Sequence, residues 1–154
     1  MAPKYQGGCL ITYQTLNSVT EKDAEHIGDL VNVLSTHAPR PSVEQITRVA
    51  ETNIVIVAID NDPNPRTIVG MVTLVVIDQL VGKRGRVEDV AVLPSYEGRG
   101  IGRGLMERLH ARARESGIAK LALTSAPRRE AANALYVKLG YKKYETNVYQ
   151  LYLA

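Results

Sequence analysis

The strongest chemical signal in the chain is a glycine-rich segment, EGRGIGR at residues 97–103. It follows an apolar stretch that ends at Pro94, and it precedes a run of apolar residues at helical spacing. The first turn of a helix presents unpaired backbone N–H groups and about half a positive charge. Glycines at Gly98, Gly100 and Gly102 let an anion approach these amides without meeting a Cβ atom. The segment therefore predicts a cradle for a phosphate or diphosphate group.

Two other glycine-rich phosphate motifs do not fit this segment. No Gly-Lys-Ser/Thr follows at the spacing of a P-loop, and the glycines do not satisfy G-x-G-x-x-G. A plain turn between a strand and a helix remains the alternative. Several basic residues lie near this segment in the sequence, and they either form a solvated surface or attract anions. They are Lys83, Arg84, Arg86, Arg99 and Arg103.

Hydrophobic periodicity predicts the elements that must position this segment. Thr20 with Asp23, and Ser42 with Gln45, resemble capping boxes that open two helices. Gly117 and Gly140 are placed to end two later helices. Expected strands cover residues 10–16, 54–59, 68–77, 87–92, 121–124 and 144–153, with a turn at 82–85; expected helices cover 20–34, 42–51, 101–117 and 128–139. This order predicts an α/β (α+β) domain with a mixed sheet.

Composition narrows the class of protein. The 154 residues suit one domain, and 45% apolar with 23% charged residues is typical of a globular protein. No apolar run reaches the ~20 residues that span a bilayer, and no secretory signal is visible, so we expect no membrane association and a cytoplasmic location. A net charge of +3 is too small to argue for nucleic acid. The single Cys9 forms no internal disulfide, and no Cys/His cluster has metal-ligand spacing.

Two motifs resemble the GNAT superfamily of N-acetyltransferases. The first is the segment at residues 97–102, preceded by a Val-Ala-Val strand end and a proline. The second is AANALYVKLGY at residues 131–141, a helix that ends in Leu-Tyr and is followed by Leu-Gly-Tyr. The resemblance covers nearly the whole chain. It implies a single acetyltransferase domain with a mixed, mostly antiparallel sheet of six to seven strands and about four helices.

The resemblance also implies acetyl-CoA as cosubstrate, with no metal. The loop amides would hold the diphosphate, and the pantetheine arm would pair with the strand that precedes the loop. Two departures stand out: Glu97 replaces the usual Gln or Arg, and Arg129 replaces a coenzyme-contacting Asn. The expected coenzyme-binding residues are Val90, Ala91, Val92, Gly98, Arg99, Gly100, Ile101, Gly102, Arg103, Arg129 and Asn133.

Acetyl transfer to an amine needs a base, an acid for the departing thiolate and a donor to the carbonyl oxygen. By resemblance, Tyr136 is the candidate acid, against the alternative of a packing tyrosine. Glu88 is the leading base and Asp89 the second, because both acids lie in a strand that is otherwise apolar. Either acid could instead be structural and pair with a nearby arginine. The backbone N–H of Val92 is the expected oxyanion donor.

The sequence thus predicts an N-acetyltransferase that moves an acetyl group directly to a primary amine in a ternary complex. The acceptor is a small molecule or a peptide amine, with no nucleic acid as partner, and the family resemblance also allows a homodimer. The strand EDVAV at residues 88–92 is similar to that of glucosamine-6-phosphate N-acetyltransferases, which makes an amino-sugar phosphate one alternative acceptor. A non-catalytic acyl-CoA-binding module and a plain interaction domain are the alternatives from other classes.

Overall fold

The computed structural model describes residues 4–6, 9–62 and 65–153. Contacts divide the chain into two units, residues 1–123 and residues 124–154. The first unit contains the described sheet and the helices α1 to α3, and the second contains α4. The expectation of one acetyltransferase domain over residues 1–154 stays a prediction.

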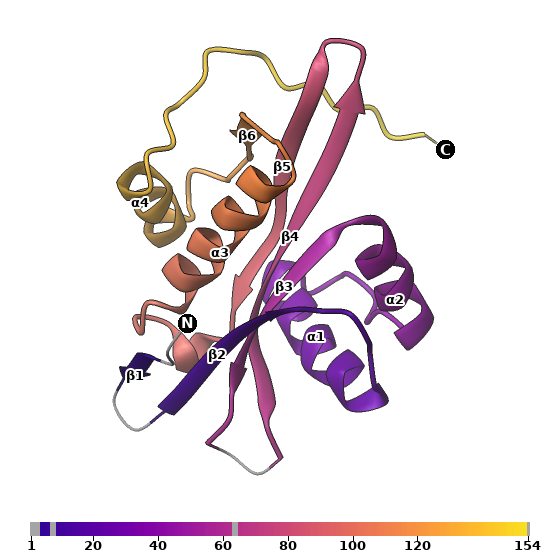
Figure 1. Cartoon of the computed structure of the whole chain (residues 1–154), viewed down its shortest axis with the longest axis vertical. Coiled ribbons are helices and arrows are strands. Elements are labelled where there is room, and N and C mark those ends of the chain that lie inside the picture. Colours follow the sequence, from indigo (N-terminus) through magenta and orange to yellow (C-terminus); the bar gives the residue numbers. More distant parts are fainter. Residues whose placement is uncertain (1–3, 7–8, 63–64, 154) are drawn as a thin grey trace. The chain divides into compact units, whose positions relative to one another are not determined.

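Six described strands form one sheet in the order β1-β2-β3-β4-β5-β6 (Figure 1). The pairs from β1 to β5 are antiparallel, and β6 joins β5 in parallel. This mixed, mostly antiparallel sheet confirms the predicted fold class. The strands are β1 (Lys4–Gln6), β2 (Cys9–Thr15), β3 (Ile54–Asp60), β4 (Thr67–Gln79), β5 (Gly82–Val92) and β6 (Leu121–Ala122).

Both predicted capping motifs begin helices. In α1 (Glu21–Leu34), the Thr20 side chain accepts from the Asp23 amide, and the Asp23 carboxylate accepts from the Thr20 amide, which completes a capping box. In α2 (Val43–Thr52), the Ser42 hydroxyl accepts from the amide of Gln45 over 3.2 Å. These bonds satisfy amides that have no partner within their helix, so each helix starts where the sequence indicates.

The sheet carries helices on both faces. Met71 of β4 belongs to the apolar cluster that includes side chains of α1 and α2. Its neighbour Gly70 points to the opposite face, where a Cβ atom would lie 3.0 Å from Leu105 and 3.2 Å from Ile101 of α3 (Ile101–Glu115). Figure 1 shows α3 along the sheet on the side away from α1 and α2. The functional loop before α3 is therefore fixed to a fully packed sheet.

Helix α3 approaches β2 closely at one glycine. A Cβ atom on Gly104 would lie 2.1 Å from the phenol oxygen of Tyr13, so a side chain there would displace the ring. The guanidinium of Arg108, one turn further along, lies 5.1 Å from the centre of the same ring. Burial raises the pKa of the Tyr13 phenol. The contact sets how near the first turns of α3 lie to the sheet.

Two expected features are corrected by the structure. The turn predicted at residues 82–85 lies at Leu80 and Val81, and β5 already begins at Gly82, where φ is +118°. Both turn residues are exposed although they are apolar, which concealed the turn in the sequence. The strands predicted at residues 144–153 are wrong, because this segment has no regular secondary structure. Its apolar side chains are exposed, and it forms no ladder with another strand of the described part of the chain.

The second unit contains one helix, α4 (Glu130–Lys138), which Figure 1 draws in yellow-brown near the end of the chain. Gly140 follows it with φ of +93°, as the sequence predicts for a left-handed helix end. The rings of Tyr136 and Tyr141 meet edge to face with their centres 5.9 Å apart. None of the helices in the described part of the chain has the length and apolar character needed to cross a membrane.

Candidate active site

The loop between β5 and α3 turns on two glycines in the left-handed region. The chain passes through a short 3₁₀ turn, Pro94–Tyr96, and then through Gly98 at φ +73° and Gly100 at φ +76°. Gly100 is also the N-cap of α3, where it has no side chain to occupy the helix start. Residues with a Cβ adopt this conformation at a cost of roughly 1–2 kcal/mol, which explains glycine at both positions.

The geometry of this loop suits an anion. The first recorded bond between α3 and its N-cap runs from the Gly104 amide to the Gly100 carbonyl over 3.0 Å, so the amides of Ile101, Gly102 and Arg103 precede it. Space beside the loop is open, because a Cβ atom on Gly98 would meet no other atom within 4 Å. A diphosphate therefore fits against these residues on both steric and electrostatic grounds.

Two arginines add positive charge next to these amides. The Arg99 guanidinium lies 4.8 Å from the centre of the Tyr96 ring and donates from Nη2 to the Ser95 carbonyl over 3.1 Å. Arg103 forms an exposed ion pair with Glu107 at 3.9 Å, a distance and exposure at which such pairs contribute little. Both side chains therefore place positive charge beside the first turn of α3.

Beyond Arg86, one side of β5 has no neighbouring strand in the described part of the chain. Strand β6 pairs with β5 only at Gly85 and Arg86. The ladder between β4 and β5, by contrast, continues to Val92. The backbone of Val90, Ala91 and Val92 thus has strand β4 on one side only, which leaves an edge that an extended arm could pair with.

A β-bulge interrupts β5 at the two predicted acids. Glu88 pairs with Thr73 and Ala91 with Met71, so Asp89 and Val90 face the single residue Val72. Asp89 has φ of +54°, which is unusual for a residue other than glycine. The bulge brings the Asp89 carboxylate to the Thr73 hydroxyl, which donates to Oδ2 over 3.2 Å. Regular alternation would have pointed Asp89 away from Glu88, whereas here both acids reach the face of Thr73.

The two acids have different partners. Glu88 accepts a hydrogen bond from Nε of Arg86, two residues earlier on the same face of the strand. This is the arginine pairing that the sequence left open as an alternative to a catalytic role. Burial raises the pKa of the Asp89 carboxyl and the nearby charge of Glu88 adds to that effect, while the bond from Thr73 opposes it. The two acids therefore differ in their surroundings: Asp89 has a raised pKa and a threonine partner, whereas Glu88, which the sequence ranks first, is paired with an arginine.

The remaining predicted residues lie in the second unit. Tyr136 is buried on α4, and that burial raises the pKa of its phenol while Arg129 opposes the shift. Arg129 is the N-cap of α4. The side chain of Asn133 donates to the carbonyl of Ala126 over 3.0 Å and so braces the turn before the helix. Just before that turn, the Ser125 hydroxyl is buried and has no hydrogen-bond partner among the described residues.

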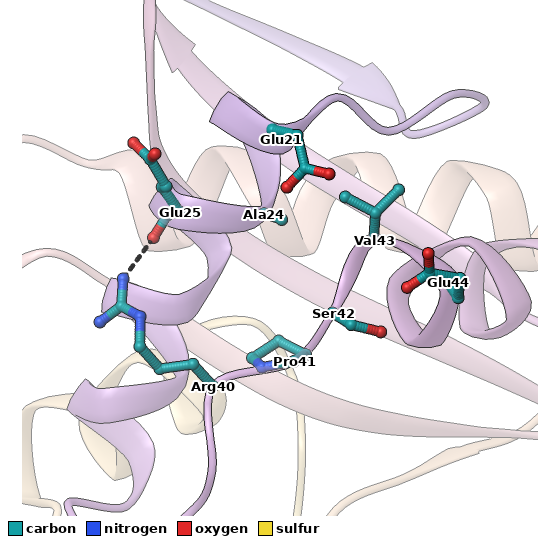
Figure 2. Close-up of a pocket in the computed structure, with 8 residues that line it drawn as sticks. All are labelled: Glu21, Ala24, Glu25, Arg40, Pro41, Ser42, Val43 and Glu44. Carbon is teal, nitrogen blue, oxygen red and sulfur yellow. Dashed lines mark hydrogen bonds between the residues drawn. The ribbon is translucent and has the colours of Figure 1, made fainter.

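A pocket of about 230 Å³ lies between the start of α1 and the segment that leads into α2. Three carboxylates line it, and Figure 2 shows Arg40 reaching across to the Glu25 carbonyl, a bond of 2.7 Å. The hydrogen bond from Lys22 holds the pKa of Glu25 below its usual value. The full lining is Glu21, Ala24, Glu25, Arg40, Pro41, Ser42, Val43 and Glu44.

Three residues that contact the strand β5 or the loop after it were not predicted from the sequence: Thr73, Tyr96 and Asp60. Thr73 is the hydroxyl that bonds to Asp89, and its position as the one polar residue in the run MVTLVV was a usable signal. Tyr96 donates from its hydroxyl to the carboxylate of Asp60 over 2.7 Å. These two residues are 36 positions apart, so no local pattern relates them.

Neither the described part of the fold nor its side chains suggests a metal centre. Among the described residues, no three His, Cys, Asp or Glu side chains form a group that could hold a metal ion. The acidic pair on β5 contacts a threonine and an arginine.

The loop after the bulged strand β5 thus opens a helix with glycines and suits an anionic cosubstrate such as one that carries a diphosphate. Comparison with known proteins agrees, since residues 23–141 match the Acetyltransferase (GNAT) family. The chain belongs to this family and is an enzyme of the N-acetyltransferase type. Enzymes of the family use acetyl-CoA as the acyl donor.

One relative and two solved structures are similar to the chain over most of its length. A glucosamine 6-phosphate N-acetyltransferase of Trypanosoma brucei brucei is 33% identical over 117 residues, which cover 71% of this chain and 77% of the relative. The crystal structure of an acetyltransferase from Trypanosoma brucei has a TM-score of 0.74 at 26% identity and covers 93% of this chain and 99% of that one. A glucosamine-6-phosphate N-acetyltransferase from Arabidopsis thaliana shares the fold, with a TM-score of 0.70 at 16% identity over 92% of this chain and 98% of that one.

Proposed function

We propose that this enzyme transfers the acetyl group of acetyl-CoA directly to a primary amine within a ternary complex. The observation that carries the proposal is the loop before α3, in which Gly98 and Gly100 adopt left-handed conformations ahead of the first amides of the helix. Those amides, together with Arg99 and Arg103, bind the diphosphate in this proposal. The open side of β5 at Val90 to Val92 is the edge for the pantetheine arm.

Asp89 and Tyr136, both of which have a raised pKa, are the proposed base and acid. Asp89 takes the proton from the acceptor ammonium, because its raised pKa makes it a stronger base than an ordinary carboxylate. The resulting lone pair attacks the thioester carbonyl, the C–S bond breaks, and the sulfur needs one proton. The attacking nitrogen releases a second proton as the amide forms, which balances the proton that the sulfur takes up. Tyr136 donates that proton, since its raised pKa keeps the phenol protonated at neutral pH. The backbone N–H of Val92 is the proposed donor to the carbonyl oxygen.

Glu88 has a supporting role in this proposal. It forms an ion pair with Arg86, and its charge adds to the rise in the pKa of Asp89. We therefore propose Asp89, rather than Glu88, as the base. The sequence ranks Glu88 first, and the contact of Glu88 with Arg86 is the reason for the change in order.

The decisive experiment is binding of acetyl-CoA to the variant Gly102→Asp. A side chain and a negative charge in the first turn of α3 would oppose the diphosphate, so we expect calorimetry to detect no binding. Calorimetry with unchanged affinity would refute the cradle. Ala111→Asp, on an exposed position of the same helix, is the matched control and should bind acetyl-CoA as the unmodified chain does.

An amino-sugar phosphate is the acceptor that one specific observation favours. The relative at 33% identity is named a glucosamine 6-phosphate N-acetyltransferase. We propose to test glucosamine 6-phosphate against glucosamine, free amino acids, a polyamine, an aminoglycoside and a peptide amine, with release of the free coenzyme thiol as readout. A kcat/KM that is highest for glucosamine 6-phosphate and falls when its phosphate is absent supports this acceptor. Equal rates with and without the phosphate contradict it.

A further inference from the structure

A buried carboxylate lies behind the proposed coenzyme loop. Asp60, the last residue of β3, is only 1% exposed. Its Oδ2 accepts a hydrogen bond of 2.7 Å from the hydroxyl of Tyr96, and its Oδ1 accepts one of 3.0 Å from the amide of Asp62. Bonds to a carboxylate in such an environment are among the stronger ones in proteins.

This bond joins parts of the sheet that are not neighbours. Tyr96 ends the 3₁₀ turn after β5, whereas Asp60 ends β3, and β4 lies between the two strands. The loop entry is thus held from two strands away. Because Tyr96 comes two residues before Gly98, the bond fixes the chain immediately before it enters the two left-handed glycines.

The same tyrosine also positions a charge. The Arg99 guanidinium lies over the Tyr96 ring at 4.8 Å, and the Ser95 carbonyl accepts one of its N–H bonds over 3.1 Å. A single side chain thereby connects a buried carboxylate on one side to a solvent-facing cation on the other. The direction of that cation follows from the orientation of the ring.

We propose that Asp60 and Tyr96 are positioning residues for the diphosphate cradle: their bond sets the loop amides and Arg99 in the binding geometry before the coenzyme arrives. The inference depends on the proposed binding of acetyl-CoA at this loop. Two glycines with no side chain make the loop flexible in the absence of such a restraint. A loop that is ordered before binding does not lose conformational entropy in the binding step. The bond between Asp60 and Tyr96 should therefore increase the affinity for the coenzyme.

The test compares Tyr96→Phe with the unmodified full-length enzyme. Phenylalanine keeps the ring under Arg99 and removes only the hydroxyl. We expect the Kd and the KM for acetyl-CoA to rise about tenfold, the loss typical of one hydrogen bond to a charged group. The kcat and the KM for the amine should stay unchanged, because neither residue touches the reacting atoms. Asp60→Asn is the second variant, and its smaller increase should reflect an amide oxygen that still accepts the bond.

A control variant that only lowers the stability of the fold should give a different result from Tyr96→Phe. Asn53 precedes β3 at the end opposite Asp60, and its side chain caps α2 by donating to the Val49 carbonyl over 3.1 Å. Asn53→Ala should therefore lower the melting temperature and leave the KM for acetyl-CoA unchanged. An equal rise in KM for Asn53→Ala and Tyr96→Phe would overturn the proposal, as would an unchanged Kd in Tyr96→Phe. If the unmodified enzyme itself fails to bind acetyl-CoA, the proposed function fails as well.

Discussion

The hydroxyl of Thr73 on β4 donates a hydrogen bond of 3.2 Å to the carboxylate of Asp89, the residue at the bulge of β5. The donor lowers the pKa of Asp89, while burial and the charge of Glu88 raise it. The balance of these effects gives a carboxylate that is more basic than usual yet held in a fixed direction. A substitution of Thr73 should therefore change the basicity of Asp89, the proposed catalytic base.

Thr73→Val should move the pH profile in a direction that the structure fixes. Valine has a similar shape and no hydroxyl, so the contribution that lowers the pKa of Asp89 disappears and that pKa rises further. The acid limb of the kcat/KM profile should then shift to higher pH. Asp89→Asn should remove the limb and lower kcat by ~10²–10⁴.

Glu88→Gln is the comparison for these variants. If Asp89 is the base, loss of the Glu88 charge lowers the pKa of Asp89, so the acid limb should shift to lower pH with kcat largely retained. A kcat loss for Glu88→Gln as large as that for Asp89→Asn would contradict this order of the two acids.

Gly98→Ala and Gly117→Ala form a matched pair on either side of α3. The two glycines have φ of +73° and +70°, and a Cβ atom at either would meet nothing within 4 Å. Both variants should lose about 1 kcal/mol of unfolding free energy, because alanine is strained in this conformation. Only Gly98→Ala should also weaken acetyl-CoA binding, by about tenfold, since its Cβ atom takes the space beside the loop amides. Denaturant titration and calorimetry measure the two effects separately, and equal affinities for the pair would count against the cradle.

Tyr136→Phe should lower kcat by ~10²-fold or more and leave the Kd for acetyl-CoA nearly unchanged. The variant removes the proposed acid and keeps the ring that packs against Tyr141. Burial raises the pKa of Tyr141 to about 12, so its phenol is a weaker acid than an ordinary tyrosine. Tyr141→Phe is the control that changes a neighbouring phenol, and it should retain most of its kcat. Loss of activity in the control alone would move the acid role to Tyr141.

Sequence patterns predicted the parts of this molecule that depend on local spacing. Alternation and β-branched runs located β2 to β4 and the second half of β5, and the Thr20–Asp23 pair located the start of α1. The bulge at Asp89 was not predictable, because an extra residue in a strand depends on how the partner strand pairs with it. The Asp60–Tyr96 bond arises only when the sheet is assembled. The terminal segment at 144–153 misled prediction because strand-like composition does not supply a partner strand.

The stability of the first unit should depend on pH through His26 of α1. Its Nδ1 accepts a hydrogen bond of 3.3 Å from the amide of Ile68 at the start of β4, which requires the unprotonated nitrogen. Burial lowers the pKa of His26 from 6.5 and Lys22 adds to the shift, while Asp23, Asp29 and Glu25 oppose it. The folded state thus binds the proton less readily than the unfolded state. The stabilisation is complete above pH 6.5 and is lost as the pH falls from there through the folded-state pKa.

His26→Asn isolates this contribution. The asparagine oxygen can accept the same amide hydrogen and does not titrate. At low pH the urea midpoint of the variant should therefore stay unchanged, whereas the midpoint of the unmodified chain falls. We expect the midpoints of the two proteins to be similar near about pH 8 and to diverge toward about pH 5, with the variant the more stable. His37→Asn, at an exposed position, should follow the unmodified chain throughout. Parallel profiles for His26→Asn and the unmodified chain would show that the Ile68 bond does not control this pH dependence.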